Sequence, residues 1–440
     1  MTSNPWQAPL AGTPVNADIT IPGSKSLTNR ELVLSAIAEG RSTISGALSA
    51  RDTILMINAL ETLGARIDTG ADNWAVEPIT PVTGSTPVTI ECGLAGTVMR
   101  FIPAIAARCT RPVRFTADEQ ANSRPMAPLF QALRSVGVDV TYETDKPFPV
   151  VVQGPARVDG PIQVDSSASS QFLSALLLIA PLLEGEGQYT DIQLTGKAPS
   201  LPHIEMTMEA LRARGVEVDW ISESAVRVRR QAIGARDVVI EPDLSNAGPF
   251  LAAAIVTGGQ VRIPYWPLKT TQAGNEWLRI LREMGAELNL VPQGTVYATL
   301  CARADSLHGF NGDMSQYGEL VPTLAAICAF ADTPSRIENI GHLRGHETDR
   351  LTAIATELTK LGIDVEEGED YLAIDPTNGW QGKLSGPITL HSYADHRMAT
   401  LGAIIGLKAP GIHVDNIETV SKTMPEFVKL WSKMLDGAHA

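Results

Sequence analysis

Residues 21–40 read IPGSKSLTNRELVLSAIAEG, and this stretch decides how the rest of the chain is interpreted. Lys25 and Arg30 stand among Ser, Thr and Asn, directly before an apolar run. A helix that is apolar nearly all round is typical of a protein core, whereas hydroxyl and amide side chains at its start are typical N-terminal caps. The stretch therefore predicts a buried helix whose first turn carries two cations.

The same arrangement, an Ala-, Leu- and Ile-rich helix opened by polar residues, occurs six times. The other copies are AGTVMRFIPAIAA, SASSQFLSALLLIAPLL, LSNAGPFLAAAIVTGG, YGELVPTLAAICAFA and YADHRMATLGAIIGL, which begin near residues 95, 167, 244, 317 and 393. The period is roughly 70–80 residues, longer than in solenoids but recognised by the same self-similarity. Six copies divide into three and three, which predicts two similar domains.

A second pattern, a helix that ends at Gly and runs into a strand, occurs five times. Its copies are INALETLGARID at 57, FQALRSVGVDV at 130, MEALRARGVEVDW at 208, LRILREMGAELNL at 278 and ATELTKLGIDVEE at 355. Apolar residues at helical spacing, a Gly cap and then alternation are the signals of these elements. They predict a mixed α/β fold with domains at 24–241 and at 1–23 plus 242–440, the segment AGTPVNADITIPG pairing with the second domain.

The composition indicates a globular protein with more than one core. A chain of 440 residues exceeds the usual size of a single core, and 44% apolar with 19% charged residues is ordinary for a globular protein. Four cysteines without a C-x-x-C pair favour a reducing compartment. Because no basic segment precedes an apolar one at the N-terminus and no apolar run reaches about 18 residues, we expect no leader, no membrane span and a cytoplasmic location.

The charge balance determines which ligands the chain can bind. A net charge of −14 disfavours nucleic acid and anionic membranes, so an anionic ligand requires a local cluster of cations. The N-terminus of a helix favours an anion by about 0.3–1 kcal/mol, whereas it disfavours an Arg in its first turn. Each polar helix start alone could be a simple cap. Repeated starts that carry Arg30, Arg100 and Arg397 instead predict an anion site at which they gather.

Seven motifs, in order over nearly the whole chain, resemble the 5-enolpyruvylshikimate-3-phosphate (EPSP) synthase family. They are GSKSLTNR at 23–30, LAGTVMR at 94–100, SRP at 123–125, SSQF at 169–172, HETDR at 346–350, DHRM at 395–398 and SKTMP at 421–425. The resemblance implies two domains, each of three βαβαββ repeats around buried helices (an inside-out α/β barrel), with the active site in the cleft between them. It also implies transfer of the enolpyruvyl group of phosphoenolpyruvate to the 5-hydroxyl of shikimate 3-phosphate, with release of phosphate, by a monomer without metal or organic cofactor.

The resemblance also assigns roles to individual residues. Phosphoenolpyruvate is expected to contact Lys25, Gly96, Arg124, Arg350, Arg397 and Lys422. Shikimate 3-phosphate is expected to contact Lys25, Ser26, Arg30, Ser169, Ser170, Gln171 and Ser200, with His346 at a further substrate-binding position. Glu319, which also contacts substrate, accepts the hydroxyl proton, Glu347 donates a proton to the methylene carbon, and Lys25 shares in catalysis. Arg100 shapes the phosphate site, and Asp395 is expected to fix Arg397 through an ion pair.

Four positions depart from residues common in the family. Leu94, His203, His342 and His346 stand where Asn, Tyr, Asn and Lys are frequent. His346 matters most, because a histidine carries only part of a positive charge near neutral pH. His342 and His346, four residues apart, also have the spacing of two metal ligands, but no third ligand at catalytic spacing is evident. We therefore expect no metal.

Two other functions remain open at this point. UDP-N-acetylglucosamine enolpyruvyl transferases share the architecture, but that family carries an Asn after the first Lys and a reactive Cys in the region of residues 115–125. Here Ser26 follows Lys25, and the segment ADEQANSRP contains no Cys. The second alternative is an anion-binding protein of the same fold without catalytic activity, although both carboxyl groups and all the cations are present. The resemblance also implies inhibition by glyphosate at the phosphoenolpyruvate site.

Overall fold

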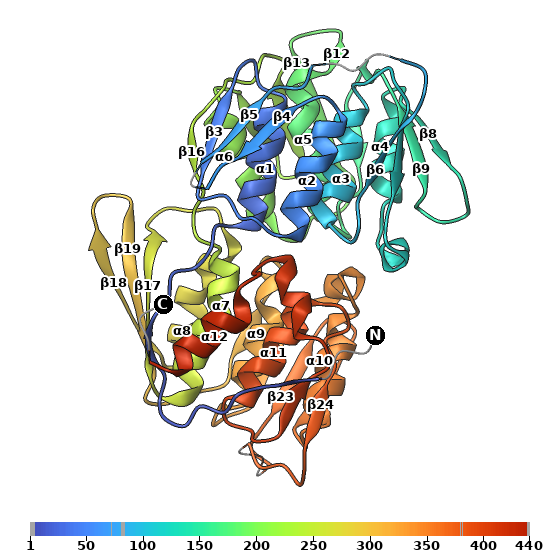
Figure 1. Cartoon of the computed structure of the whole chain (residues 1–440). Helices are drawn as coiled ribbons and strands as arrows, with labels where there is room; N and C mark the ends of the chain where they lie inside the picture. Colours follow the sequence, from blue (N-terminus) through green and yellow to red (C-terminus); the bar gives the residue numbers. More distant parts are fainter. Residues whose placement is uncertain (1–4, 72, 81–83, 379, 381, 438–440) are drawn as a thin grey trace. The chain divides into compact units, whose positions relative to one another are not determined.

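The computed structural model describes residues 5–71, 73–80, 84–378, 380 and 382–437. Residues 1–4 of the N-terminal stretch examined above lie outside this range. The chain divides into two compact units, labelled here unit 1 (Met1–Pro22 and Glu241–Ala440) and unit 2 (Gly23–Ile240). Both are drawn in Figure 1, where many of their helices and strands are labelled.

Unit 2 repeats one order of elements three times: a buried helix, one or two strands, an amphipathic helix, and three or four further strands. Its helices are α1 (Lys25–Ala36), α2 (Arg51–Thr62), α3 (Gly96–Ala106), α4 (Ala127–Ser135), α5 (Gln171–Ile179) and α6 (Leu201–Arg212), with the short 3₁₀ helices η1 (Glu119–Ser123) and η2 (Ala180–Leu182). Its strands are β3 (Ser42–Ser45), β4 (Arg66–Thr69), β5 (Asn73–Glu77), β6 (Val88–Glu91), β7 (Val113–Thr116), β8 (Asp139–Tyr142), β9 (Val150–Gln153), β10 (Arg157–Val158), β11 (Ile162–Val164), β12 (Glu184–Gly185), β13 (Tyr189–Leu194), β14 (Val218–Ser222), β15 (Ala225–Arg229) and β16 (Val238–Val239).

Each repeat of unit 2 forms a four-stranded sheet with the same topology. The strand orders are β16-β3-β5-β4, β6-β7-β9-β8 and β11-β13-β15-β14. In each sheet the first pair is parallel, as Val88 opposite Val113 shows, and the later pairs are antiparallel. The last strand of the unit, β16, pairs with the first, β3, so the third repeat closes on the first.

Unit 1 follows the same plan. Its helices are α7 (Leu244–Thr257), α8 (Trp277–Glu283), α9 (Val321–Cys328), α10 (Arg350–Thr359), α11 (His396–Gly406) and α12 (Phe427–Leu435), with the 3₁₀ helices η3 (Ala273–Glu276), η4 (Gly318–Leu320), η5 (Gly341–Gly345) and η6 (Ile417–Lys422). Its strands are β1 (Trp6–Gln7), β2 (Asn16–Asp18), β17 (Gln260–Pro267), β18 (Glu287–Gln293), β19 (Tyr297–Arg303), β20 (Asn311–Asp313), β21 (Ser335–Glu338), β22 (Asp364–Glu367), β23 (Leu372–Asp375), β24 (Ile388–Leu390) and β25 (Ile412–Val414).

The third repeat of unit 1 is incomplete. Two sheets, β18-β19-β17-β2 and β20-β21-β23-β22, have four strands, whereas the third, β1-β25-β24, has three. After β25 the described chain forms η6 and the amphipathic helix α12, which is not followed by a hairpin, and β1 supplies the antiparallel neighbour. The expectation of three full βαβαββ repeats therefore needs correction for this unit, because no strand follows α12 in the described residues.

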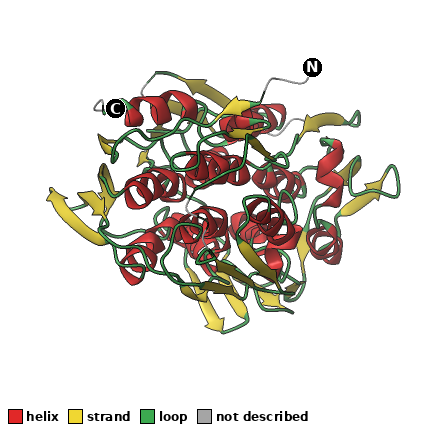
Figure 2. Cartoon of the chain, turned by 90° about the horizontal axis from the view of Figure 1, so that it is seen from below, coloured by secondary structure: helices red, strands yellow, loops and turns green. Residues whose placement is uncertain are grey.

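The buried helices form the centres of the two units. All residues of α3 are buried, and so are all residues of α7 except the last, Thr257. Helices gather inside and strands lie toward the rim in Figure 2. Such burial stabilises a helix without a polar face, because its apolar side chains contact neighbours on every side. No helix in the described part of the chain is long and apolar enough to cross a membrane.

Candidate active site

Hydrogen bonds between side chains hold the N-terminal halves of two helices of unit 2, α1 and α3, together and join α1 to the middle of α6. Asn29 on α1 donates from Nδ2 to Oγ1 of Thr97 on α3 over 2.7 Å. Arg30, one residue further, donates from Nε to Oγ1 of Thr207 on α6 over 2.8 Å. Because helix starts carry unpaired N–H groups, this arrangement gathers partial positive charge at one end of the helix layer.

Arg30 is buried inside this cluster and has a structural role in addition to any ligand contact. It is 1% exposed, and its guanidinium also donates to the carbonyl oxygens of Ser26 and His203, both over 3.0 Å. The group lies 5.3 Å from the ring centroid of Phe101. Arg30 thus holds α1 against α6, and it can offer a ligand only the N–H groups that these bonds leave over.

The clearest anion site in unit 2 surrounds Gly96, the first residue of α3. A Cβ at this position would lie 3.1 Å from Nη1 of Arg100 and 3.2 Å from both Nη atoms of Arg124. Arg100 donates to the carbonyl oxygens of Gly96 and Pro125, both over 3.3 Å. The missing side chain therefore leaves room in front of two guanidinium groups at a helix N-terminus, which is a favourable place for a phosphate.

Arg124 is a buried cation that the described residues do not neutralise. It is 8% exposed, it donates to the carbonyl oxygen of Leu94 over 3.4 Å, and its Nε has no hydrogen-bond partner within the described part of the chain. No ion pair with a carboxylate of a described residue involves Arg124. A buried guanidinium without a counter-charge is costly, so an anionic ligand is the group that would compensate it.

Lys25 begins α1, and its Nζ lies 3.3 Å from Oδ2 of Asp52 on α2. The Lys25 side chain is 18% exposed and that of Asp52 is 3% exposed, so the ammonium group can meet both a ligand and its carboxylate partner. Sequence analysis did not identify Asp52. In the sequence, Asp52 is only a lone acidic residue at the start of the second helix, and this pattern does not indicate a contact with Lys25.

The remaining predicted residues of unit 2 lie at the starts of α5 and α6. The backbone N–H of Gln171 donates to Oγ of Ser169 over 3.3 Å, and Ser170 is 5% exposed. Oε1 of Gln171 is buried and has no hydrogen-bond partner within the described residues. Ser200 precedes α6 with φ 54°, a left-handed conformation that costs a non-glycine residue about 1–3 kcal/mol and is frequent at functional sites.

In unit 1 the predicted acid Glu347 lies between two cations. Its Oε1 accepts a hydrogen bond from Nζ of Lys422 over 2.8 Å, and its Oε2 accepts one from Nη2 of Arg350 over 3.1 Å. The side chains of Lys422 and Glu347 are 8% and 11% exposed. Three residues that the motifs assign to one reaction are thus in direct contact.

Arg350, the first residue of α10, is held by a second carboxylate. Its Nε donates to Oδ2 of Asp395 over 2.7 Å, and both side chains are almost fully buried. Burial alone would lower the pKa of Arg350, but the carboxylates of Asp395 and Glu347 raise it, so the guanidinium is charged. The expected ion pair between Asp395 and Arg397 is wrong: Asp395 caps α11 and accepts the backbone N–H of Arg397 over 2.9 Å, while its ion pair is with Arg350.

His346 and His342 lie beside this cluster. Nη1 of Arg350 lies 2.9 Å from Nδ1 of His346, and because arginine can only donate, His346 accepts there and carries its proton on Nε2. The rings of His342 and His346 are 5.7 Å apart. Burial, and then the charge of Arg350, lower the pKa of His342 from 6.5 to about 4. His342 is therefore neutral near pH 7 in this arrangement.

Glu319, the predicted base, lies in η4 and accepts a short hydrogen bond from the hydroxyl of Ser245 on α7. Ser245 is 6% exposed. Sequence analysis passed over Ser245, although the repeated polar helix start LSNAG was the signal that could have identified it. Its hydroxyl orients the carboxylate that the resemblance assigns to proton removal.

Within each unit the structure therefore gathers several of the predicted residues. In unit 2 these are the residues around Gly96 and the starts of α1, α5 and α6; in unit 1, Glu347, Arg350, Lys422 and His346 are linked directly. Arg397 is half-buried, and its guanidinium forms no ion pair with a carboxylate of a described residue. No group of three or more His, Cys, Asp or Glu among the described residues has the geometry of a metal site.

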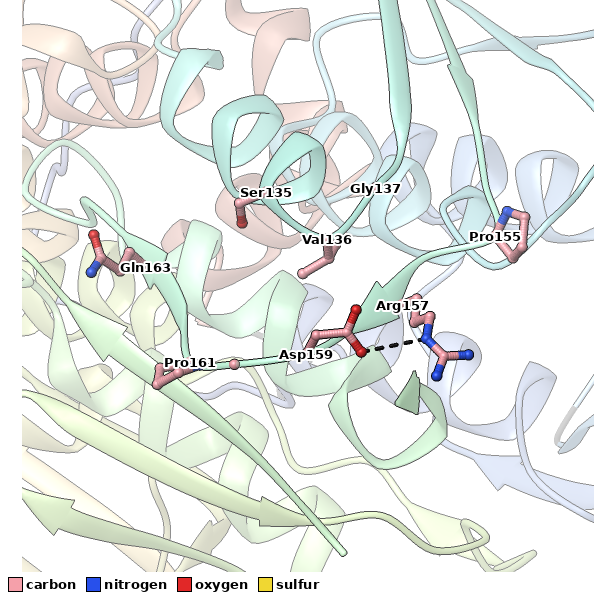
Figure 3. A pocket seen from close by; sticks show the side chains of 9 residues that line it. Ser135, Val136, Gly137, Pro155, Arg157, Asp159, Pro161 and Gln163 are labelled. Atoms are coloured by element: carbon pink, nitrogen blue, oxygen red, sulfur yellow. Dashed lines mark hydrogen bonds and ion pairs between the residues drawn. The ribbon is translucent and has the colours of Figure 1, made fainter. Parts of the chain in front are cut away.

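A separate hollow on unit 2 differs in character from these clusters. It has a volume of about 600 Å³ and is lined by Ser135, Val136, Gly137, Pro155, Arg157, Asp159, Gly160, Pro161 and Gln163. Figure 3 shows its one ion pair, Arg157 with Asp159, at 3.4 Å, with side chains that are 62% and 69% exposed. None of the predicted site residues lines it, so it is not the candidate site.

Comparison with solved structures places this fold in one class. An EPSP synthase from Acinetobacter baumannii superposes with a TM-score of 0.78 at 23% identity and covers 98% of each chain. The enolpyruvyl transferase NikO from Streptomyces tendae superposes with a TM-score of 0.75 at 16% identity, over 97% of this chain and 96% of that one. The chain therefore has the enolpyruvyl transferase fold, as the sequence predicted.

The sequence comparisons narrow the class to one family. The family model described as EPSP synthase (3-phosphoshikimate 1-carboxyvinyltransferase) matches residues 10–431. A 3-phosphoshikimate 1-carboxyvinyltransferase from Kocuria rhizophila is 47% identical over 439 residues, 98% of this chain and 96% of that protein. This chain belongs to the EPSP synthase family, which confirms the resemblance inferred from the seven motifs.

Proposed function

We propose that the protein transfers the enolpyruvyl group of phosphoenolpyruvate to the 5-hydroxyl of shikimate 3-phosphate and releases inorganic phosphate. Its family and its 47% identical relative support this reaction. The observation that carries the proposal is the pair of guanidinium groups of Arg100 and Arg124 around the bare Cα of Gly96. This arrangement fits a phosphate better than any neutral ligand.

Two anions must be held side by side, which costs several kcal/mol at the dielectric of a partly buried site unless cations intervene. Residues of both units are proposed to supply these cations, each unit acting as one of the two predicted domains. The phosphoenolpyruvate contacts are Lys25, Gly96, Arg124, Arg350, Arg397 and Lys422. The shikimate 3-phosphate contacts are Lys25, Ser26, Arg30, Ser169, Ser170, Gln171, Ser200, Glu319 and His346.

The chemistry is an addition followed by an elimination. Glu319, oriented by Ser245, accepts the proton of the 5-hydroxyl as its oxygen bonds to the carbon that bears the phosphate. Glu347 donates a proton to the methylene carbon, which gives a tetrahedral intermediate. Loss of phosphate and of a methyl proton restores the double bond, while the cations, Lys25 among them, stabilise the developing charge.

Two cations contact Glu347 and favour its ionised form. A carboxyl group must be protonated before it can donate a proton. Bound anions attract Lys422 and Arg350, the same two cations that contact Glu347 over 2.8 and 3.1 Å. Substrate binding would then weaken both contacts and place the carboxyl group beside new negative charge, which favours its protonated form. The proposal therefore links substrate binding to activation of the acid.

The alternatives predict different products. A UDP-N-acetylglucosamine enolpyruvyl transferase would use the nucleotide sugar as acceptor, and a protein without activity would bind both anions and release no phosphate. Phosphate release by the purified protein, measured with phosphoenolpyruvate and either acceptor, separates the three. We expect release only with shikimate 3-phosphate. Release with the nucleotide sugar, or binding without release, would overturn the proposal.

We also propose that the protein acts as a cytoplasmic monomer that binds neither nucleic acid nor membranes. The net charge of −14 supports the last two points because it repels polyanions at long range. Light scattering of the purified protein tests the oligomeric state, and a mass of twice that of the chain would contradict a monomer.

A further inference from the structure

A strained turn precedes α11 in unit 1. Two successive non-glycine residues, Tyr393 and Ala394, have left-handed φ angles of 53° and 55°. The turn ends at Asp395, which caps α11 and pairs with Arg350, and the next residue but one is Arg397. Non-glycine residues keep such a conformation only where surrounding contacts enforce it.

A buried carboxylate on α10 makes the contacts that hold this left-handed turn in place. The side chain of Glu357 is 0% exposed, and its Oε1 accepts a hydrogen bond from the Tyr393 hydroxyl over 2.5 Å. Its Oε2 accepts the backbone N–H of His391 over 3.1 Å. Lys360 lies 2.7 Å from both oxygens and neutralises the group. Burial, and then the bond to Glu357, raise the pKa of Tyr393, so its hydroxyl keeps the proton that it donates.

Helix α10 thus holds the segment 391–395 at two points. Arg350 at the start of the helix bonds to Asp395, and Glu357, seven residues later, bonds to His391 and Tyr393. Residues seven apart lie on the same face of a helix, two turns from each other. The segment can therefore not shift along α10 without breaking one of the two attachments.

We propose that Tyr393 and Glu357 are positioning residues for phosphoenolpyruvate binding. They fix the turn that orients Arg397 and that places Asp395, the ion-pair partner of Arg350. The inference rests on the proposed function of Arg397 and Arg350. Neither Tyr393 nor Glu357 is among the proposed substrate contacts. Loss of their bond loosens the turn, and Arg397 then binds its anion with less favourable geometry.

The test compares Tyr393→Phe with Tyr371→Phe. Tyr371 makes a hydrogen bond of the same length, 2.5 Å, to Glu366, but on the exposed hairpin β22–β23. Tyr393→Phe is expected to raise KM for phosphoenolpyruvate about tenfold, with KM for shikimate 3-phosphate within about twofold of wild type. Tyr371→Phe leaves both values unchanged. An unaltered KM for phosphoenolpyruvate, or an equal rise in both constants, would overturn the inference.

Glu357→Gln and a double variant sharpen the test. Glu357→Gln replaces one of the two acceptor oxygens by an NH2 group and removes the charge that Lys360 neutralises, so its effect on KM for phosphoenolpyruvate is expected to be at least as large as that of Tyr393→Phe. If Tyr393 acts through Arg397, then Tyr393→Phe adds less than about twofold when introduced into Arg397→Lys. A full tenfold effect in that background means that Tyr393 acts independently of Arg397, which contradicts the proposal.

A structural readout separates this inference from the proposed reaction. Amide hydrogen exchange of residues 391–397 is expected to be faster in Tyr393→Phe than in Tyr371→Phe, because the turn opens more often. If the wild-type protein releases no phosphate, the proposed function fails, yet exchange still reports whether Tyr393 holds the turn. Equal exchange in the two variants would overturn the positioning role even in an active enzyme.

Discussion

Lys422 and Glu347, 75 residues apart in the sequence, are joined by a hydrogen bond of 2.8 Å in a site where each is almost fully buried. Arg350 contacts the other oxygen of the same carboxylate. The proposed acid is thus held by two of the cations that are proposed to bind phosphoenolpyruvate. Its protonation and substrate binding depend on the same contacts.

Glu347→Gln tests this role. The amide keeps the shape and one acceptor oxygen but cannot deliver a proton, so we expect turnover to fall at least about a hundredfold while the protein stays folded. Phosphate release under saturating substrates measures it. Glu287→Gln, on the exposed strand β18, is the matched control. Unaltered turnover in Glu347→Gln would remove the residue from the mechanism.

Gly96→Ala tests the space in front of the two arginines. The added methyl group would lie 3.1–3.2 Å from the guanidinium nitrogens of Arg100 and Arg124, so these flexible ends must move by tenths of an ångström. We expect an unchanged melting temperature and a rise of about tenfold in KM for phosphoenolpyruvate. Gly160→Ala, where nothing lies within 4 Å, serves as control. Wild-type kinetics of Gly96→Ala would show that no ligand group needs this space.

The depressed pKa of His342 predicts a loss of stability in acid. Folding lowers it from 6.5 to about 4, so between these values the unfolded chain binds a proton that the folded protein does not. The part of the unfolding free energy that depends on neutral His342 is fully present above pH 6.5 and is lost as the pH falls toward 4. The total loss is at most roughly 3 kcal/mol. Urea unfolding of wild type and His342→Asn at pH 7 and pH 5 measures it. The variant is expected to lose less stability, and equal losses would contradict this origin.

Glu31→Gln tests a buried ion pair that lies outside the proposed chemistry. Glu31 accepts from Nη2 of Arg214 over 2.7 Å, and the two side chains are 5% and 0% exposed. The substitution leaves a buried guanidinium without its counter-charge, so we expect a loss of about 3–5 kcal/mol in unfolding free energy with unchanged kcat of the folded protein. Glu217→Gln, which removes an exposed pair with Arg229, should leave stability unaltered. Equal stability of the two variants would refute the prediction.

The buried helices could be predicted because their signals are local. Polar caps followed by residues that are apolar on every side marked all six starts, and the structure confirms helices there. At α5 the predicted start near 167 was four residues early, since Ser side chains compete for backbone groups and the helix begins at Gln171. The Gly-capped pattern occurred five times, and the repeat without it is the one with three strands.

The contacts within the site could not be predicted in the same way. Asp395 and Arg397 are neighbours in sequence, but the carboxylate of an N-cap residue faces backbone N–H groups, and its ionic partner Arg350 comes from another helix. Likewise Asp52, Ser245 and Glu357 became relevant only through tertiary contacts. Motifs assigned residue types to a reaction, whereas the partners that orient them depend on packing between distant segments.

The central claim is that Arg124, which is buried, and Arg397, which is half-buried, bind phosphoenolpyruvate, neither of them being paired with a carboxylate of a described residue. Its most direct test is kcat/KM for phosphoenolpyruvate at saturating shikimate 3-phosphate in Arg124→Ala and Arg397→Ala. The exposed, ion-paired Arg227→Ala and Arg303→Ala serve as controls. We predict a fall of at least about a hundredfold in both site variants and wild-type values in both controls. A wild-type value in either site variant would contradict the claim.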